Sequence, residues 1–253
     1  MYDKIVRKII KIFIMIFITI LIATIVALLI LKYNVEGENN MPFELSKIMV
    51  ISTAEGIDKN NEEYTQNKWD LNIVQNNDIY IEISKNKNYK ETEIIDEIII
   101  DNFKIIEEPK VGKLKIYKPS EKDAVTYKNI EENEIKDILI YTGAEKSSVK
   151  KLELANQGGL VLFRYAIEDL GVYTLETEEI KHDGTIISKT DVNYNDLKCK
   201  VSFDLSIKLK SEITYMGNIV LDLPAGNILE EGTSHYEKTN LNDIVFKRSY
   251  SHN

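Results

Sequence analysis

The chain has a single cysteine, Cys199, in 253 residues, which excludes an intrachain disulfide. The stability of the fold must therefore come from packing. Proline and glycine are also sparse, with 4 and 11 residues, so neither a collagen-like chain nor a low-complexity disordered one fits. We expect a folded protein with a sizeable core, in which Cys199 is a buried and inert thiol.

Signatures of the common enzyme classes are missing as well. The three histidines, His182, His235 and His252, do not have the spacing of zinc ligands. The sequence has no Gly-rich phosphate loop, no Gly-x-Ser-x-Gly and no His-Glu-x-x-His. Five pairs of adjacent acids could in principle supply glycosidase carboxylates, but their loop contexts indicate solvated surface. These pairs are Glu62-Glu63, Glu107-Glu108, Glu131-Glu132, Glu178-Glu179 and Glu230-Glu231. We predict no catalytic, cofactor-binding or metal-binding residue and no enzyme activity.

Positive charge is scarce beyond the N-terminal segment. The formal charge is −9, and four of the basic residues, Lys4, Arg7, Lys8 and Lys11, precede a long apolar run. Past them, 28 basic residues stand against 40 acidic ones. Because such a surface repels phosphate backbones, we predict that nucleic acid is not a partner.

The long apolar run extends from Ile12 to Leu31, twenty residues without charge, proline or glycine. A helix of this length spans about 30 Å, the thickness of a bilayer's hydrocarbon core. We predict a transmembrane helix at residues 9–32, in contact with the lipid bilayer. The basic residues before it place residues 1–8 in the cytoplasm and the rest of the chain outside.

The alternative is a secreted protein with a cleaved signal peptide. Signal peptides have apolar regions of about 7–15 residues, followed by small residues at the cleavage site. The run here is longer, and the best candidate site, Val35-Glu36-Gly37, is poor. We therefore favour a retained signal anchor, followed by a stalk at residues 33–45 and an extracytoplasmic domain at residues 46–253.

The exterior part has no stretch with a linker's composition after Asn40, which favours one domain. Two smaller sandwiches meeting near residues 119–148 are the alternative. The abundance of Ile, Lys and Asn, whose codons are AT-rich, indicates a low-GC bacterium. We therefore expect the domain to belong to a bacterial cell envelope.

The clearest strand pattern lies between Leu197 and Leu209, where apolar and polar residues alternate strictly. This pattern predicts an antiparallel strand with one face in a core and the other in water. The alternation continues to Tyr215 and returns at Ile219, and it leaves open whether one bent strand or two cover this region. Glu93 to Phe103 fits a helix or a strand, and its β-branched content favours a strand.

Four hairpins are predicted from turn residues between apolar runs. Their turns are Asn76-Asn77, Glu108-Pro109 with Gly112, Asn156-Gln157-Gly158-Gly159 and Asp183-Gly184. About a dozen short strands with frequent turns are typical of an all-β protein. We predict an antiparallel β-sandwich preceded by the single transmembrane α-helix.

The segment Asp169-Leu170-Gly171-Val172-Tyr173 lies between two apolar strands. It resembles the Asp-x-Gly-x-Tyr tyrosine corner of immunoglobulin-like domains, in which a tyrosine hydroxyl bonds back to the backbone at a strand crossover. The chain departs from antibody-type domains at Leu175, where the second disulfide cysteine would stand, and Trp69 has no cysteine before it. The resemblance implies a sandwich and names no ligand.

Two polar patterns have structural interpretations. Arg164 lies among apolar residues of a predicted strand, where an unpaired guanidinium is costly, so we expect it to pair with a carboxylate such as Asp169. Asp191, Asn193 and Asn195 match the opening of a calcium loop. The later positions of that loop lack its glycine and closing glutamate, which favours a polar turn.

These observations favour a non-enzymatic binding or assembly component of the cell envelope with an envelope protein as partner. A tether confines a domain near the bilayer and raises its effective concentration for neighbouring proteins. Two alternatives are an envelope hydrolase built from residues distant in sequence, and a signal-transducing partner subunit. Only about eleven residues precede the apolar run, so a partner would have to carry such a signal.

Overall fold

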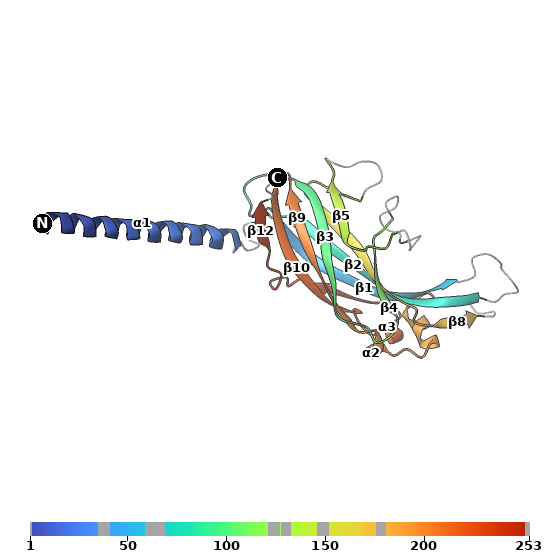
Figure 1. Ribbon diagram of the computed structural model, residues 1–253. Coiled ribbons are helices and arrows are strands. Elements are labelled where there is room, and N and C mark those ends of the chain that lie inside the picture. The colour runs from blue at the N-terminus through green and yellow to red at the C-terminus, as the bar shows by residue number, and fades with distance from the viewer. Residues whose placement is uncertain are drawn as a thin grey trace.

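The computed structural model describes residues 2–34, 41–58, 69–120, 127, 133–145, 152–175 and 181–250. Helix α1 (Tyr2–Asn34) is followed by strands that form two sheets (Figure 1). α1 leaves the domain at the end where it contacts β12. Between Lys8 and Ala27, α1 is long and apolar enough to cross a membrane, and none of this stretch is buried in the protein.

Sheet 1 has six strands in the order β11-β1-β2-β7-β4, with β8 also paired to β2. They are β1 (Phe43–Asp58), β2 (Trp69–Lys85), β4 (Lys113–Tyr117), β7 (Gly158–Glu168), β8 (Val172–Leu175) and β11 (Ser234–Lys238). Its neighbouring strands are all antiparallel.

Sheet 2 also has six strands, in the order β12-β10-β9-β3-β5-β6. They are β3 (Ile95–Glu107), β5 (Ile138–Gly143), β6 (Glu153–Leu154), β9 (Cys199–Leu209), β10 (Ile213–Leu223) and β12 (Lys247–Tyr250). Its pairs are antiparallel except β5 with β6. Three short helices complete the described elements, namely η3 (Gly184–Lys189), α2 (Tyr194–Leu197) and α3 (Ile228–Glu231).

The two sheets enclose the main hydrophobic core, to which residues between Met41 and Phe246 contribute. Phe163 of sheet 1 and Phe203 of sheet 2 are both fully buried, and their ring centroids lie 5.0 Å apart in an edge-to-face arrangement. The predicted antiparallel β-sandwich after an apolar helix is thereby confirmed. Met41 and Phe43, in the segment expected to be a stalk, are buried in this core.

The alternating segment is confirmed as a strand. It begins at Cys199, two residues later than predicted, because Leu197 ends α2. A turn that contains Glu212 at φ 64° separates β9 from β10, so two strands rather than one bent strand cover the region. The segment from Glu93 to Phe103 contains the start of β3, which confirms the preference for a strand.

The hairpin predicted at Asn76-Asn77 is wrong, because β2 runs through both residues without a turn. Gln75 and Asn77 occupy core-facing positions and are fully buried. The Asn77 amide donates to Gln75 Oε1 at 2.9 Å, and Ser52 Oγ of β1 donates to Asn77 Oδ1 at 2.7 Å. These polar side chains form hydrogen bonds with one another inside the sandwich. In the sequence, the same polar residues have the composition of a turn.

The other three predicted hairpins are wrong as well. β3 belongs to sheet 2 and β4 to sheet 1, so the chain crosses between sheets near Glu108-Pro109. β6 and β7 likewise lie in different sheets. Asp183 caps η3, where its carboxylate accepts from Thr185 N at 2.9 Å. Turn residues predict where the chain changes direction. They do not predict whether the next strand pairs with the previous one or joins the other sheet.

The segment that resembles a tyrosine corner makes no crossover. β7 and β8 both pair with β2, over Gln75–Ser84 and Trp69–Asn72 respectively, so they follow one edge of the same strand. Leu170 N donates to Ile73 O at 3.3 Å between them. Asp169 has φ 59° and Gly171 has φ 146°. The segment is therefore a short irregular stretch between two strands that pair with the same edge of β2.

Strand β5 is fixed to the opposite sheet by Tyr141. The Tyr141 hydroxyl donates to Leu162 O at 2.9 Å and accepts from Leu162 N at 3.2 Å, at a part of β7 that lies beyond β4. The Tyr141 hydroxyl thus bonds to the backbone N–H and C=O of β7 that a neighbouring strand of sheet 1 would otherwise pair with. This contact holds the edge of sheet 2 that carries Ile138 and Ile140.

Candidate functional site

Arg164 forms the buried ion pair that its sequence context predicts, but with another partner. Its Nε donates to Asp78 Oδ1 at 2.6 Å, and one terminal nitrogen donates to Asp78 Oδ2 at 3.1 Å. The guanidinium also lies 4.1 Å from the Tyr127 ring centroid. Asp169, the expected partner, pairs with Lys113 at 3.1 Å instead. Strand register decides this, because Arg164 and Asp78 are directly paired across β7 and β2.

The other polar candidates are not brought together. Asn193 precedes α2, and Asp196 forms an ion pair with Lys110 at 3.6 Å. His182 and His235 are exposed, before η3 and on β11, while His252 lies outside the described residues. Of the acidic pairs, Glu62-Glu63, Glu131-Glu132 and Glu178-Glu179 also lie outside them. Within the described ranges, no three His, Cys, Asp or Glu side chains form a possible metal site.

Cys199 is buried at the start of β9, as expected. Burial, followed by the charge of Asp222, raises the pKa of its thiol to about 12. The thiolate is therefore scarce at neutral pH, and the residue is a poor nucleophile in the folded protein.

The outer face of sheet 2 carries a row of four aligned residues, three of them apolar, which we call the apolar row. Strand register aligns Ile140 of β5, Ile99 of β3, Ser206 of β9 and Met216 of β10 across four neighbouring strands. Ile140 is 41% exposed and Met216 is 44% exposed, whereas the small Ser206 between them is buried. The surface along the row is therefore recessed at Ser206 and protrudes at Ile140 and Met216.

Further exposed apolar residues surround this row. They are Ile138 on β5, Val220 on β10 and Val245 just before β12. In Figure 1, β10, β9, β3 and β5 face the viewer, and no described helix crosses them. Scattered apolar residues are normal on a protein surface, but several on one sheet face indicate an interaction site.

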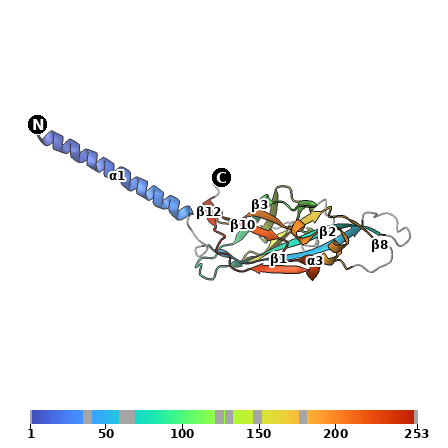
Figure 2. The ribbon, with the colours of Figure 1, turned by 90° about the horizontal axis from the view of Figure 1, so that it is seen from below.

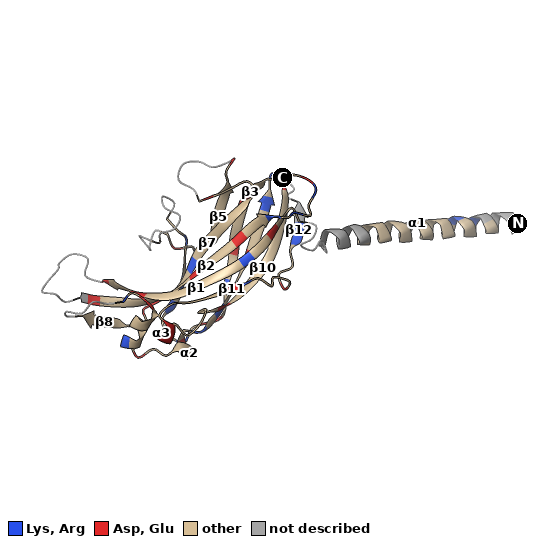
Figure 3. Cartoon of the chain, turned by 180° about the vertical axis from the view of Figure 1, so that it is seen from behind, with Lys and Arg blue, Asp and Glu red and all other residues tan. Residues whose placement is uncertain are grey.

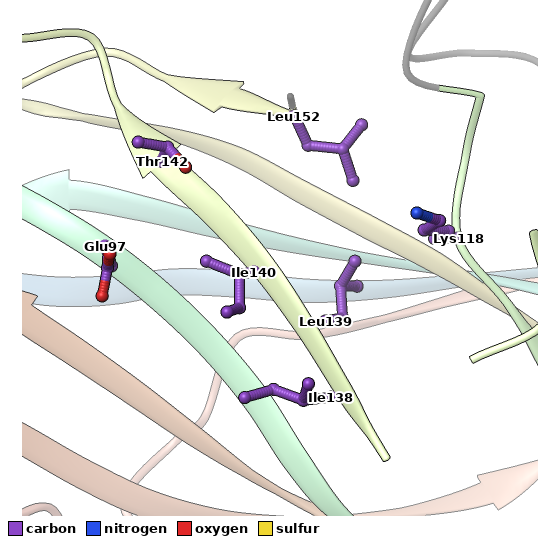
Figure 4. A pocket seen from close by; sticks show the side chains of 7 residues that line it. All are labelled: Glu97, Lys118, Ile138, Leu139, Ile140, Thr142 and Leu152. Atoms are coloured by element: carbon purple, nitrogen blue, oxygen red, sulfur yellow. The ribbon is translucent and has the colours of Figure 1, made fainter. Parts of the chain in front are cut away.

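Two depressions lie at the ends of the row. The first, of about 280 Å³, is lined by Glu97, Lys118, Ile138, Leu139, Ile140, Thr142 and Leu152 (Figure 4). The second, of about 410 Å³, is lined by Asp204, Met216, Asn218, Val220, Asp243, Val245 and Lys247. We call the second depression the β10 groove. The first depression lies at the β5 edge and also reaches Lys118, which follows β4 of sheet 1, and the core-facing Leu139. Both depressions contain exposed apolar residues of sheet 2, so the candidate site is the outer face of this sheet.

A like-charge pair lies beside the apolar row. Asp101 of β3 and Asp204 of β9 are direct partners in the antiparallel register. Asp204 accepts from the amides of Asn102 and Asn218, both at 2.7 Å. Neither carboxylate forms an ion pair within the described part of the chain. Elsewhere on the domain, basic and acidic positions are interspersed (Figure 3).

This pair costs stability. Like charges directly opposite each other on neighbouring strands are destabilising. Burial, and then the negative charge of Asp204, raise the pKa of Asp101 above its ordinary value. A fold that keeps such a pair departs from the arrangement that packing and electrostatics favour, and such departures occur mainly at functional sites.

Replacing Asp101 by asparagine is expected to raise the free energy of unfolding by about 0.5 kcal/mol at pH 7, because the repulsion is removed. A raised pKa means that the folded state binds the proton more tightly, so ionisation lowers stability as pH rises. The gain should vanish below about pH 3, where Asp101 is protonated in both states, and be complete above its raised pKa. Denaturant titrations of the full chain in micelles at pH 3, 5 and 7 measure this. A loss of stability at pH 7 would contradict it.

Comparison of the chain with known protein families, characterised proteins and solved structures finds no match. Function must therefore be argued from the chain's own side chains. The sequence did contain a signal for this face, because Met216 and Val220 are apolar at positions where the alternation of β10 calls for polar residues. Ile138 and Ile140 of β5 are out of phase in the same way.

Proposed function

We propose that the protein is a non-enzymatic, membrane-anchored component of a bacterial cell envelope that binds a protein partner through the outer face of sheet 2. α1 is the anchor in this proposal. The basic residues before it favour a cytoplasmic N-terminus, with the sandwich on the outer side of the cell membrane. Figure 2 shows α1 leaving one end of the domain, with β8 toward the other.

The observation that carries the proposal is the apolar row, in which Ile140, Ile99 and Met216 align across a sheet face that no described helix crosses. Antiparallel sheets with one face in water normally place polar residues there. Here exposed isoleucine, methionine and valine side chains lie around buried serines, beside a charged pair. Protein interfaces likewise combine apolar side chains with polar and charged ones. Anchoring would confine this face to the layer next to the bilayer and raise its effective concentration for envelope proteins.

The test is site-specific photo-cross-linking in intact host cells. A photoreactive residue replaces Ile140 or Met216 on the proposed face, and Leu160 on the outer face of sheet 1 is the matched control. Leu160 is 45% exposed, close to the 44% of Met216. We expect a discrete cross-linked protein species from Ile140 and Met216 that is absent, or at least about tenfold weaker, from Leu160. Equal cross-linking from both sheets, or none from sheet 2, would overturn the proposal.

A further inference from the structure

The β10 groove has an apolar part and an acidic part. Met216, Val220 and Val245 supply apolar surface, and Met216 and Val245 are 44% and 59% exposed. Asp204 lines the groove next to Asn218 and lies directly opposite Asp101 on the far side of β9. A ligand that covered the apolar part would therefore place its far end near two neighbouring carboxylates.

The charges around the groove are not balanced. Asp243, the other acid in the lining, is already paired with Lys238 at 2.5 Å. Lys247 lines the groove beside Met216, which lies two residues along β10 from Asn218. Lys247 forms no ion pair with Asp204 within the described residues. The Asp101–Asp204 pair thus has no protein cation, although Asn102 and Asn218 fix the Asp204 carboxylate in place.

We propose that the β10 groove receives a lysine or arginine side chain of the protein partner, with its aliphatic stem on Met216 and Val220 and its cationic head at Asp204 and Asp101. Long cationic side chains bury their stems on apolar surface while keeping their charge beside polar groups. A cation between the two carboxylates would convert a repulsive pair into two attractive contacts. The Asp204 carboxylate is fixed by Asn102 and Asn218 before binding, so little ordering of this group is required when the cation arrives.

This inference rests on the proposed function and names the chemistry of the partner at one point of the interface. It explains why a destabilising pair lies beside the apolar row, because the partner supplies the missing charge. It also predicts that this part of the interface is sensitive to salt, since charge pairs near the surface are screened.

The test uses small thiols of opposite charge as probes. Val220 is changed to cysteine in the full chain, held in nanodiscs of phosphatidylcholine, and exchanged with cystamine or with the disulfide of 3-mercaptopropionate. The thiolate attacks the probe disulfide, forms a mixed disulfide and releases one probe thiol. The cystamine product carries an ammonium group on a short stem, as a lysine does, and buried Cys199 does not compete. Mass spectrometry measures the equilibrium ratio of the two adducts.

We expect the cationic adduct to be favoured by roughly tenfold over the anionic one. Asp101→Asn and Asp204→Asn, singly, should each reduce this preference several-fold, and the double variant should abolish it. The matched control is Asp222→Asn, because Asp222 lies two residues from Val220 in the opposite direction along β10, is exposed, and pairs with Lys200 at 3.4 Å. Asp222→Asn should leave the preference intact, and circular dichroism confirms that each variant is folded.

A ratio near one, a preference for the anionic adduct, or a preference that depends on Asp222 would overturn the inference. Those outcomes leave the proposed function standing if Met216 still cross-links to a partner in cells. Conversely, a cation preference in the groove without cross-linking from sheet 2 refutes the proposed function, while the chemistry of the groove is retained. The two failures are therefore distinguishable.

Discussion

Replacing Phe163 by alanine is expected to lower the free energy of unfolding by about 3–5 kcal/mol. The side chain is fully buried, and its ring lies 5.0 Å from that of Phe203 and 5.8 Å from that of Phe103, both on sheet 2. Removing it leaves a cavity at the contact between the two sheets. Because domains are stable by only about 5–15 kcal/mol, the loss would be a large fraction of the total. Urea titration of the full chain in micelles, followed by circular dichroism, measures it.

Leu160→Ala is the matched control for Phe163→Ala, because Leu160 lies on the same strand and is 45% exposed. It should cost no more than about 0.5 kcal/mol. A loss below about 1 kcal/mol for Phe163→Ala would show that the two sheets do not share one core through this residue.

Breaking the Arg164–Asp78 pair from either side is expected to cost about 3 kcal/mol. The two side chains are only 15% and 14% exposed, so either variant, Asp78→Asn or Arg164→Met, leaves a buried charge with its main partner gone. Burial opposes the charge on Arg164, but the hydrogen bonds and charge of Asp78 outweigh it and raise the pKa of the guanidinium. Glu55, at 3.5 Å, compensates only in part. The same urea titrations measure both losses.

The double variant Asp78→Asn with Arg164→Met should recover at least half of the summed losses of the two single variants, because it removes both buried charges. Asp169→Asn is the control for an exposed pair, since Lys113 and Asp169 are 74% and 52% exposed, and it should change stability by less than about 1 kcal/mol. Strictly additive losses in the double variant would refute coupling between Arg164 and Asp78.

The strands of this fold could be predicted where burial alone sets the pattern. Apolar and polar residues alternate in β9 and β10 because one side of each strand faces the core. The alternation from Cys199 to Leu209 follows this burial pattern. The strand character of the segment that begins β3 follows from its isoleucines. Such patterns depend only on residues near in sequence, so they are readable without knowledge of the fold.

Sheet membership could not be predicted, because it depends on contacts between distant residues. Asn76 and Asn77 have the composition of a turn, yet Ser52 on another strand satisfies Asn77 inside the sandwich. Glu108 and Pro109 do lie between strands, but those strands enter different sheets. Local turn chemistry shows where a strand can end and leaves the next pairing undetermined.

The candidate site was equally hidden, because it forms only when the strands align. Asp101 and Asp204 are 103 positions apart in sequence and become direct neighbours through the register of β3 with β9. Ile140 and Met216 join one row only through two strands between them. The usable clue was the set of apolar residues out of phase with the core, such as Met216 and Val220.

The most direct test of an anchored exterior domain is cysteine labelling of intact cells. Ser188→Cys introduces an exposed thiol on η3, while the native Cys199 is buried and serves as the internal control. The account predicts that a membrane-impermeant maleimide labels the Ser188→Cys variant in intact cells, that the native chain stays unlabelled, and that the labelled protein sediments at full length with the membranes. Labelling only after lysis, or labelled protein released into the medium, would contradict it.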